Sequence, residues 1–219
     1  RLHARHGCGP HDHRQHDRLQ RHRRGNDSGV QLNNLTSSSS GARTLANAGT
    51  VGVAGNFTPG TNAFTITGST IDFNGSGSQT VTAFNYNNLT SSNTGARTLA
   101  SSGTIGVASV FTPGTNTFTI TGSTINFNGA GAQNIPAFNY NNLISSNSGA
   151  RTLPNGGTVG IAGGFTPGTN AFTITGSTID YNGTIPQTIS AFNYNNLTSS
   201  NSGARTLANA GTIGVASVF

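Results

Sequence analysis

Apolar and polar residues alternate in short runs from residue 33 to the end of the chain. Ile105 and Val107 are two positions apart, as are Ile125 and Phe127. Alternation with a period of two, in β-branched and aromatic residues, predicts short strands that each bury one face. The residues expected to face inward, with their equivalents 54 positions away, are Ile105, Val107, Phe118, Ile120, Ile125, Phe127 and Tyr140.

Turn-forming residues separate these runs. Thr112-Pro113-Gly114 and Asn128-Gly129 both lie between two alternating segments. Pro presets a turn, and Gly and Asn tolerate the left-handed backbone conformation that many turns need. No segment has helical periodicity, and the chain lacks the strong helix formers Glu, Lys and Met. The chain is therefore predicted to be all-β.

The whole pattern recurs at a constant spacing along the chain. The pentapeptide Gly-Ala-Arg-Thr-Leu starts at Gly41, Gly95, Gly149 and Gly203, each start 54 positions after the previous one. Three complete copies occupy 35–88, 89–142 and 143–196, and a partial copy occupies 197–219. A fixed period without insertions indicates units that stack on one another. Phe219 is the counterpart of Phe165, so we expect the chain to be a fragment of a longer protein.

Two architectures fit such copies. A β-solenoid would wind each copy into two or three rungs and pair every strand with the next rung. A row of small β-sandwich modules is the alternative, but an isolated module the size of one copy, without disulfide or metal, would bury little surface. We therefore predict a β-solenoid over residues 33–219.

Three recurring stretches resemble a known class of repeats. They are Thr50–Phe57, Gly68–Gly75 and Phe84–Thr90, which with their copies cover the repeated part. The pattern is similar to repeats of large bacterial secreted and surface proteins of the filamentous-haemagglutinin and autotransporter-passenger type. This resemblance implies a right-handed parallel β-helix, export to the cell surface or medium, elongated display and adhesion.

Charge is concentrated at the start of the chain. Of its 11 Arg, seven lie in residues 1–24, together with all six His and the single Cys8. At face value this is a basic arm for nucleic acid or a membrane surface, or a metal-binding tract. The His spacings match no standard zinc pattern, and no cofactor or specific nucleic-acid partner is expected.

A shifted reading frame explains this arm better. When Thr-Ile-Thr-Gly-Ser-Thr-Ile-Asp-Phe-Asn-Gly is written in suitable codons and read one base earlier, it gives the observed run His11–Arg21. The same shift turns Phe-Thr-Pro-Gly-Thr into Leu2–His6. We therefore interpret residues 1–32 as a frameshifted repeat that is disordered as written; an ordinary disordered cationic tail is the alternative.

The repeated part offers little catalytic chemistry. Its carboxylates after Asp27 are Asp72 and Asp180, two copies apart, and Asn126 stands at the equivalent position between them. A catalytic pair needs two carboxylates a few ångströms apart. We therefore expect no catalytic residues, no metal site and no enzyme activity in this segment.

Two recurring sets are candidates for a surface-binding ladder. Arg43, Arg97, Arg151 and Arg205 recur once per copy and would either contact acidic glycans or simply be solvated charges. The exposed strand positions that would bind carbohydrate or ice, or serve only as outward strand residues, are Thr65, Thr67, Thr119, Thr121, Thr173 and Thr175.

These observations predict a non-enzymatic structural or adhesive segment of a secreted or cell-surface protein. Its expected partners are glycans or a cell surface and the neighbouring repeats of its own longer chain, with no membrane insertion in this segment. The alternative is a carbohydrate-binding or carbohydrate-processing β-helix whose site lies outside these residues.

Overall fold

The structure, a computed structural model, describes residues 29–219, and these residues form strands and turns without a helix. Residues 1–28 of the predicted basic arm lie outside the described residues. The strands of the first half are β1 (Val30–Leu32), β2 (Leu35–Thr36), β3 (Arg43–Thr44), β4 (Thr50–Val53), β5 (Phe57–Thr58), β6 (Phe64–Thr65), β7 (Thr70–Phe73), β8 (Gln79–Val81), β9 (Asn85–Ser91), β10 (Arg97–Leu99), β11 (Ile105–Thr112), β12 (Phe118–Thr119) and β13 (Thr124–Phe127). Those of the second half are β14 (Gln133–Asn134), β15 (Asn139–Tyr140), β16 (Asn142–Ser145), β17 (Arg151–Thr152), β18 (Thr158–Ile161), β19 (Phe165–Thr166), β20 (Phe172–Thr173), β21 (Thr178–Tyr181), β22 (Gln187–Ile189), β23 (Asn193–Tyr194), β24 (Asn196–Ser199), β25 (Arg205–Leu207) and β26 (Gly214–Val215).

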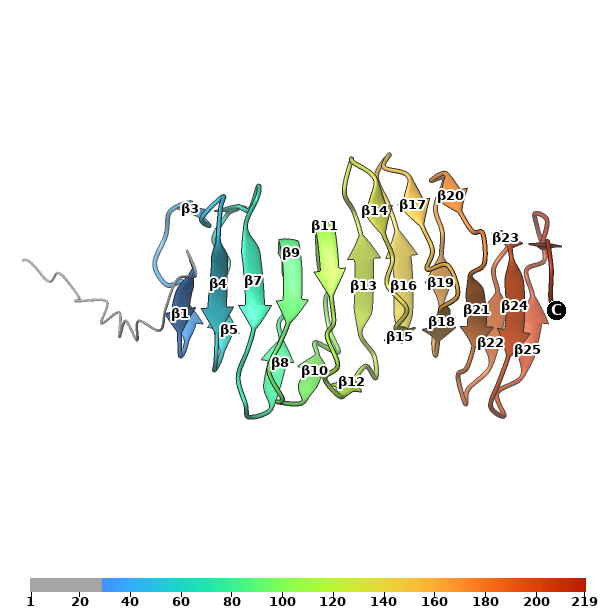
Figure 1. Cartoon of the computed structure of the whole chain (residues 1–219), viewed down its shortest axis with the longest axis horizontal. Coiled ribbons are helices and arrows are strands. Elements are labelled where there is room, and N and C mark those ends of the chain that lie inside the picture. Colours follow the sequence, from blue (N-terminus) through green and yellow to red (C-terminus); the bar gives the residue numbers. More distant parts are fainter. Residues whose placement is uncertain (1–28) are drawn as a thin grey trace, which may run out of the picture.

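The strands pair in parallel with strands one turn away along the chain. Val51 pairs with Ile71, Ile71 with Leu89, and Leu89 with Phe111. The result is a β-solenoid of about 9 turns (Figure 1). The predicted solenoid is thus confirmed, and the alternative of separate sandwich modules is wrong because the parallel pairing continues from one copy into the next.

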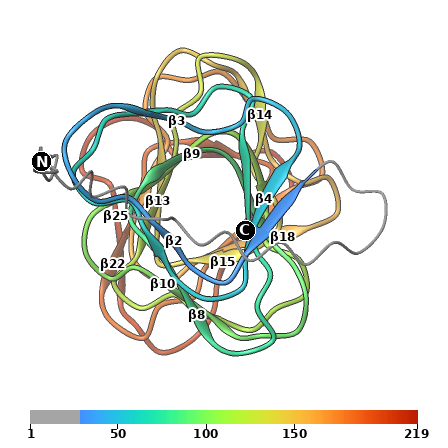
Figure 2. The same cartoon turned by 90° about the vertical axis from the view of Figure 1, so that its left-hand side faces the viewer.

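The solenoid is right-handed. Viewed from the N-terminal end in Figure 2, the chain runs clockwise from β2 through β3 to β4 while it moves away from the viewer. At about 4.8 Å per turn, the described part is about 43 Å long.

The turns do not fit a whole number of times into one copy. Three successive pairings carry the chain from Val51 to Phe111. The equivalent of Val51 in the next copy is Ile105, which the chain reaches before it completes the third turn. The prediction of two or three rungs per copy therefore needs a correction: one copy makes about 2.7 turns, and the next copy starts about a third of a turn out of step.

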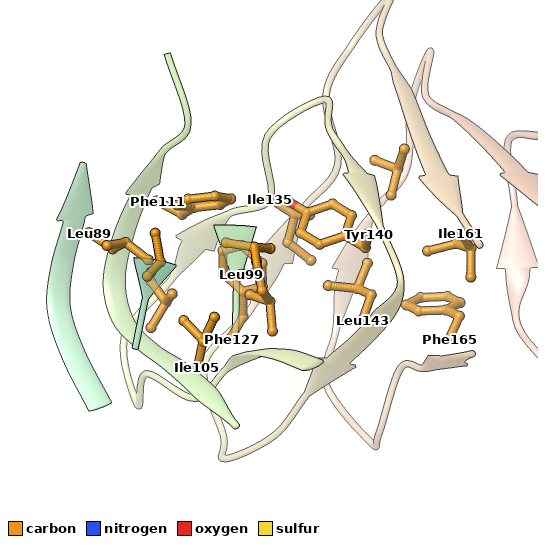
Figure 3. Close-up of a cluster of buried hydrophobic side chains, with 14 of the residues drawn as sticks. Leu89, Leu99, Ile105, Phe111, Phe127, Ile135, Tyr140, Leu143, Ile161 and Phe165 are labelled. Atoms are coloured by element: carbon orange, nitrogen blue, oxygen red, sulfur yellow. The ribbon is translucent and has the colours of Figure 1, made fainter. Parts of the chain in front are cut away.

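The interior is filled by alternate residues of the longer strands. Figure 3 shows Leu99, Ile105, Phe127, Tyr140 and neighbouring side chains inside the coil. The predicted inward residues Ile105, Val107, Ile125, Phe127 and Tyr140 are all buried, with at most 1% exposure.

Phe118 and Ile120 are exceptions to the predicted core. Both are only partly buried and pack against the edge of the core. They belong to the short strand β12 and the turn after it, where the chain rounds a corner of the coil. The ring of Phe118 meets that of Phe138 edge-on, with centroids 5.0 Å apart, so an aromatic pair covers this corner.

The solenoid includes residues that the sequence assigned to the frameshifted arm. Val30–Leu32, assigned from the sequence to the frameshifted arm, form strand β1 and pair with β4. Gln31 stands opposite Gly52, just as Asn85 stands opposite Gly106 one copy later. Gln31 supplies an amide where the other copies have Asn85 or Asn139, and it accepts a hydrogen bond from Asn74 Nδ2 at 2.7 Å.

Candidate functional site

The recurring arginines are internal. The exposed fraction of Arg97 is 0%. Its Nη2 lies 2.7 Å from the carbonyl oxygen of Phe73 in the preceding turn and 2.6 Å from that of Ser92 in its own turn. Its Nη1 donates to the Gly95 carbonyl at 2.7 Å, and its Nε donates to the Ser91 hydroxyl at 3.0 Å. The guanidinium therefore joins two successive turns at a corner.

Arg151 forms the same arrangement one copy later and is also 0% exposed. Its Nη2 donates to the carbonyls of Phe127 at 2.9 Å and Ser146 at 2.6 Å. Burial lowers the pKa of both Arg97 and Arg151, and in Arg97 the nearby Asp72 carboxylate partly opposes that shift. Neither of these two arginines is solvated, and neither can belong to a surface-binding ladder.

Arg43 and Arg205, in the first and last copies of the array, are partly buried. Among residues 29–219, Arg43 donates to carbonyls of its own turn, those of Ser38, Gly41 and Ala42. Arg205 still reaches back to the Tyr181 carbonyl at 2.6 Å. Within the described residues, all four arginines thus bond carbonyls of their own turn, and Arg97, Arg151 and Arg205 also bond carbonyls of the preceding turn.

The predicted threonines are exposed. Thr65, Thr67, Thr119, Thr121, Thr173 and Thr175 all face solvent. They do not form one array, however. Strands β6, β12 and β20, which hold the first threonine of each pair, join β3, β10 and β17 in three separate sheets. In Figure 2, β10 lies below the centre of the coil, whereas β3 and β14, the partner of β17, lie above it. The rotation between copies accounts for this separation.

The two carboxylates bind hydroxyl groups of the adjacent turn. Asp72 accepts a hydrogen bond from Ser92 at 2.7 Å. Asp180 accepts from Thr198 at 3.1 Å and Ser200 at 2.7 Å. Asn126 accepts from the equivalent hydroxyl of the middle copy at 3.0 Å. Because the amide of Asn126 takes the place of the carboxylate, the side chain at this repeat position connects adjacent turns in all three copies.

Stacked amides bridge two turns across a glycine. Asn128 Nδ2 donates to Asn85 Oδ1 at 3.2 Å, and a Cβ added to Gly106, which lies between them, would overlap that oxygen. Asn182 and Asn139 repeat this contact at 3.1 Å across Gly160. From the sequence, Asn85 was expected to bond turn backbone rather than to stack on another amide, although a glycine between two inward residues of a strand was a signal for such close stacking.

Buried glutamines were also missed. Gln79, Gln133 and Gln187 are at most 5% exposed. Each side chain accepts a hydrogen bond from a glycine N–H four positions earlier and donates to two carbonyls of the preceding turn. For Gln79 the partners are Gly75 N at 2.7 Å, Val53 O at 2.8 Å and Gly55 O at 2.7 Å.

A shallow groove lies over one aromatic corner near the end of the array. Phe172, Ile174 and Phe192 form its floor, and Asn193 and Thr212 stand at its rim. An apolar floor with amide and hydroxyl groups beside it is suited to a neutral, polyhydroxylated ligand.

The part of the chain that the structure describes contains no group of three His, Cys, Asp or Glu residues placed to hold a metal ion. Among the same residues, no helix is long and apolar enough to cross a membrane. No family profile, curated protein or solved structure shows significant similarity to the chain. Its fold defines a right-handed β-solenoid repeat protein.

Proposed function

We propose that this chain is an extended, non-enzymatic structural and adhesive segment of a larger secreted or cell-surface protein. The observation that supports this most directly is the unbroken stacking, in which every copy adds about 2.7 turns and hence about 13 Å of length. Export and surface display rest on the resemblance of the repeats to secreted bacterial surface proteins.

The surface favours a neutral partner. The two interior arginines are buried, so the exposed groups of the repeats are mainly hydroxyls and amides. The acidic glycans considered for an arginine ladder would find no recurring row of cations there. We therefore propose a neutral glycan or a neutral, hydroxyl-rich cell surface as the partner.

Binding of the full chain to immobilised neutral glycans and to whole cells tests the adhesive part. A variant with Ala at Thr65, Thr67 and their four equivalents should lose retention. A matched variant with Ala at the exposed Thr58, Thr112 and Thr166 should retain it. Equal loss in both variants, or no retention of the parent chain, would contradict this adhesive surface.

Electron microscopy of chains with added copies tests the structural part separately. Each copy should lengthen the particle by about 13 Å without adding a hinge. Particles that bend at copy boundaries, or that grow in width, would argue against a rod-like segment.

The groove over Phe172 and Phe192 supports a second candidate, a carbohydrate-binding β-helix whose processing site lies elsewhere. Affinity electrophoresis in gels containing dextran or another neutral polysaccharide would detect such binding. Replacing the rim residues Asn193 and Thr212 by Ala should restore normal mobility if the groove holds the sugar. An unchanged retardation would exclude the groove as the site.

A further inference from the structure

The chain contains four Asn-Gly pairs, at Asn74–Gly75, Asn128–Gly129, Asn155–Gly156 and Asn182–Gly183. Such pairs deamidate spontaneously because glycine has no Cβ to hinder attack by its nitrogen. The deprotonated glycine nitrogen attacks the side-chain carbonyl carbon of asparagine, ammonia leaves, and a succinimide forms. Water then opens this ring to aspartate or isoaspartate. The reaction requires the glycine N–H and the asparagine side chain to leave the partners that hold them.

Three of the pairs have their glycine N–H engaged by a buried glutamine. Gly129 N lies 2.8 Å from Gln133 Oε1. Gln133 is itself fixed, because its Nε2 donates to the carbonyls of Val107 and Ser109, both at 2.9 Å. Gln79 and Gln187 hold Gly75 and Gly183 in the same way, at 2.7 and 2.8 Å.

The asparagine of each such pair is fixed as well. The side chain of Asn128 is bonded to Asn85 across Gly106, and its backbone carbonyl accepts from Asn147 Nδ2 at 3.0 Å. The Gly129 carbonyl accepts from Arg151 Nη2 at 3.1 Å. Attack would require the Gly129 nitrogen to leave its glutamine acceptor and the Asn128 side chain to leave its partner.

The fourth pair differs in its exposure and in the acceptor of its glycine N–H. Asn155 and Gly156 are exposed and lie in the turn between β17 and β18. The Gly156 N–H donates to a backbone carbonyl, that of Gly176, at 3.0 Å, and no glutamine side chain holds it. Ser101 occupies the position of Asn155 in the preceding copy, so this reactive pair is particular to one copy.

We propose that Asn155 is a site of spontaneous deamidation in the folded array, and that Gln79, Gln133 and Gln187 protect the other three pairs. The inference is independent of the proposed adhesive function. Conversion of Asn128 to a carboxylate would place a negative charge against the Asn85 carbonyl oxygen, so the protected pairs are also the ones where the modification would disturb stacking.

The test is peptide mapping of the full chain after incubation in mildly alkaline buffer, with mass spectrometry and enzymatic labelling of isoaspartate. In the parent chain, Asn155 should be modified about tenfold or more faster than Asn74, Asn128 and Asn182. In Gln133→Met, Asn128 should become modified while Asn182, in the same molecule, stays intact. Comparable rates at all four pairs in the folded parent would overturn the proposal.

Ile135→Ala is the control that separates loss of the glutamine acceptor from general loosening of the turn. Ile135 is buried two positions after Gln133, and its truncation weakens packing at the same corner without touching the Gly129 acceptor. Modification of Asn128 should rise much more in Gln133→Met than in Ile135→Ala. An equal rise in both variants, or none in a folded Gln133→Met, would show that the glutamine is not the protecting group.

Discussion

Truncation of Arg151 should be among the most damaging single changes in the array. Arg151→Ala removes six hydrogen bonds to backbone carbonyls from a side chain that is 0% exposed. Three of them, to Phe127, Ser146 and Gly149, are 2.9 Å or shorter. Leaving a buried acceptor unpaired costs roughly 1–3 kcal/mol, and water can reach some of these oxygens once the side chain is gone. We therefore expect a loss of about 3–5 kcal/mol in the free energy of unfolding.

Arg43→Ala is the matched control. The same residue type stands at the same position of the repeat, but its three side-chain bonds to residues that the structure describes are exposed and stay within its own turn. Its loss should cost about 1 kcal/mol or less. The free energy of unfolding of Arg151→Lys should be close to that of Arg151→Ala, because one ammonium group cannot bond carbonyls on both sides of the corner.

Urea unfolding followed by circular dichroism would measure these differences. Since repeat arrays can unfold in segments, native-state hydrogen exchange at the amides around β14 and β17 should accompany it. If Arg151→Ala costs no more than Arg43→Ala, the buried guanidinium is not a principal connection between turns.

Three further perturbations test other parts of the packing. Gly106→Ala should lower stability by about 2 kcal/mol or more, because the added Cβ would overlap Asn85 Oδ1. In Gly131→Ala the added Cβ has no atom within 4 Å, so thermal unfolding should show a change within about 0.5 kcal/mol. Ile125→Asp should cost several kcal/mol because Ile125 is 1% exposed, and Ile120→Asp should cost clearly less in the same denaturation assay. Burial raises the pKa of Tyr140, so the protein should lose stability once the pH exceeds about 10, where unfolded tyrosines ionise. Tyr140→Phe should lose less stability at alkaline pH, and tyrosinate absorbance would report the ionisation that accompanies unfolding.

The fold was accessible from the sequence because two simple patterns agreed. A period of two in residues such as Ile125 and Phe127 gives strands with one buried face, and a constant repeat spacing without insertions requires those strands to stack. The number of turns per copy was not accessible. It depends on how much chain each corner uses, and the turns from Val51 to Ile71, from Ile71 to Leu89 and from Leu89 to Phe111 differ in length.

The arginine role was predicted wrongly for a specific reason. Charged residues were assumed to be solvated, although the local alternation pointed inward. Arg97, Thr98 and Leu99 are buried, exposed and buried in turn, so Arg97 shares a face with a core leucine. Gln79, Thr80 and Val81 follow the same order. Applying the period of two to polar residues as well would have identified both buried groups.

The fractional winding explains how a charge can recur in every copy and still be buried. Arg97 pairs with Gln79 on one side and Phe118 on the other, so it does not stack on another arginine. Arg151 likewise lies between Gln133 and Phe172. Each position therefore meets two different partners, and a substitution is tolerated only if it fits both.

The same winding determines how a partner meets the surface. Because successive copies are rotated by about a third of a turn, a given side of the coil shows the same copy surface only about every eight turns, or about 38 Å. A flat surface would touch one copy in three, whereas a flexible polymer wrapped around the coil could contact all of them. Avidity that grows with every added copy would thus favour a flexible glycan, and avidity that rises only with each third copy would favour a planar surface.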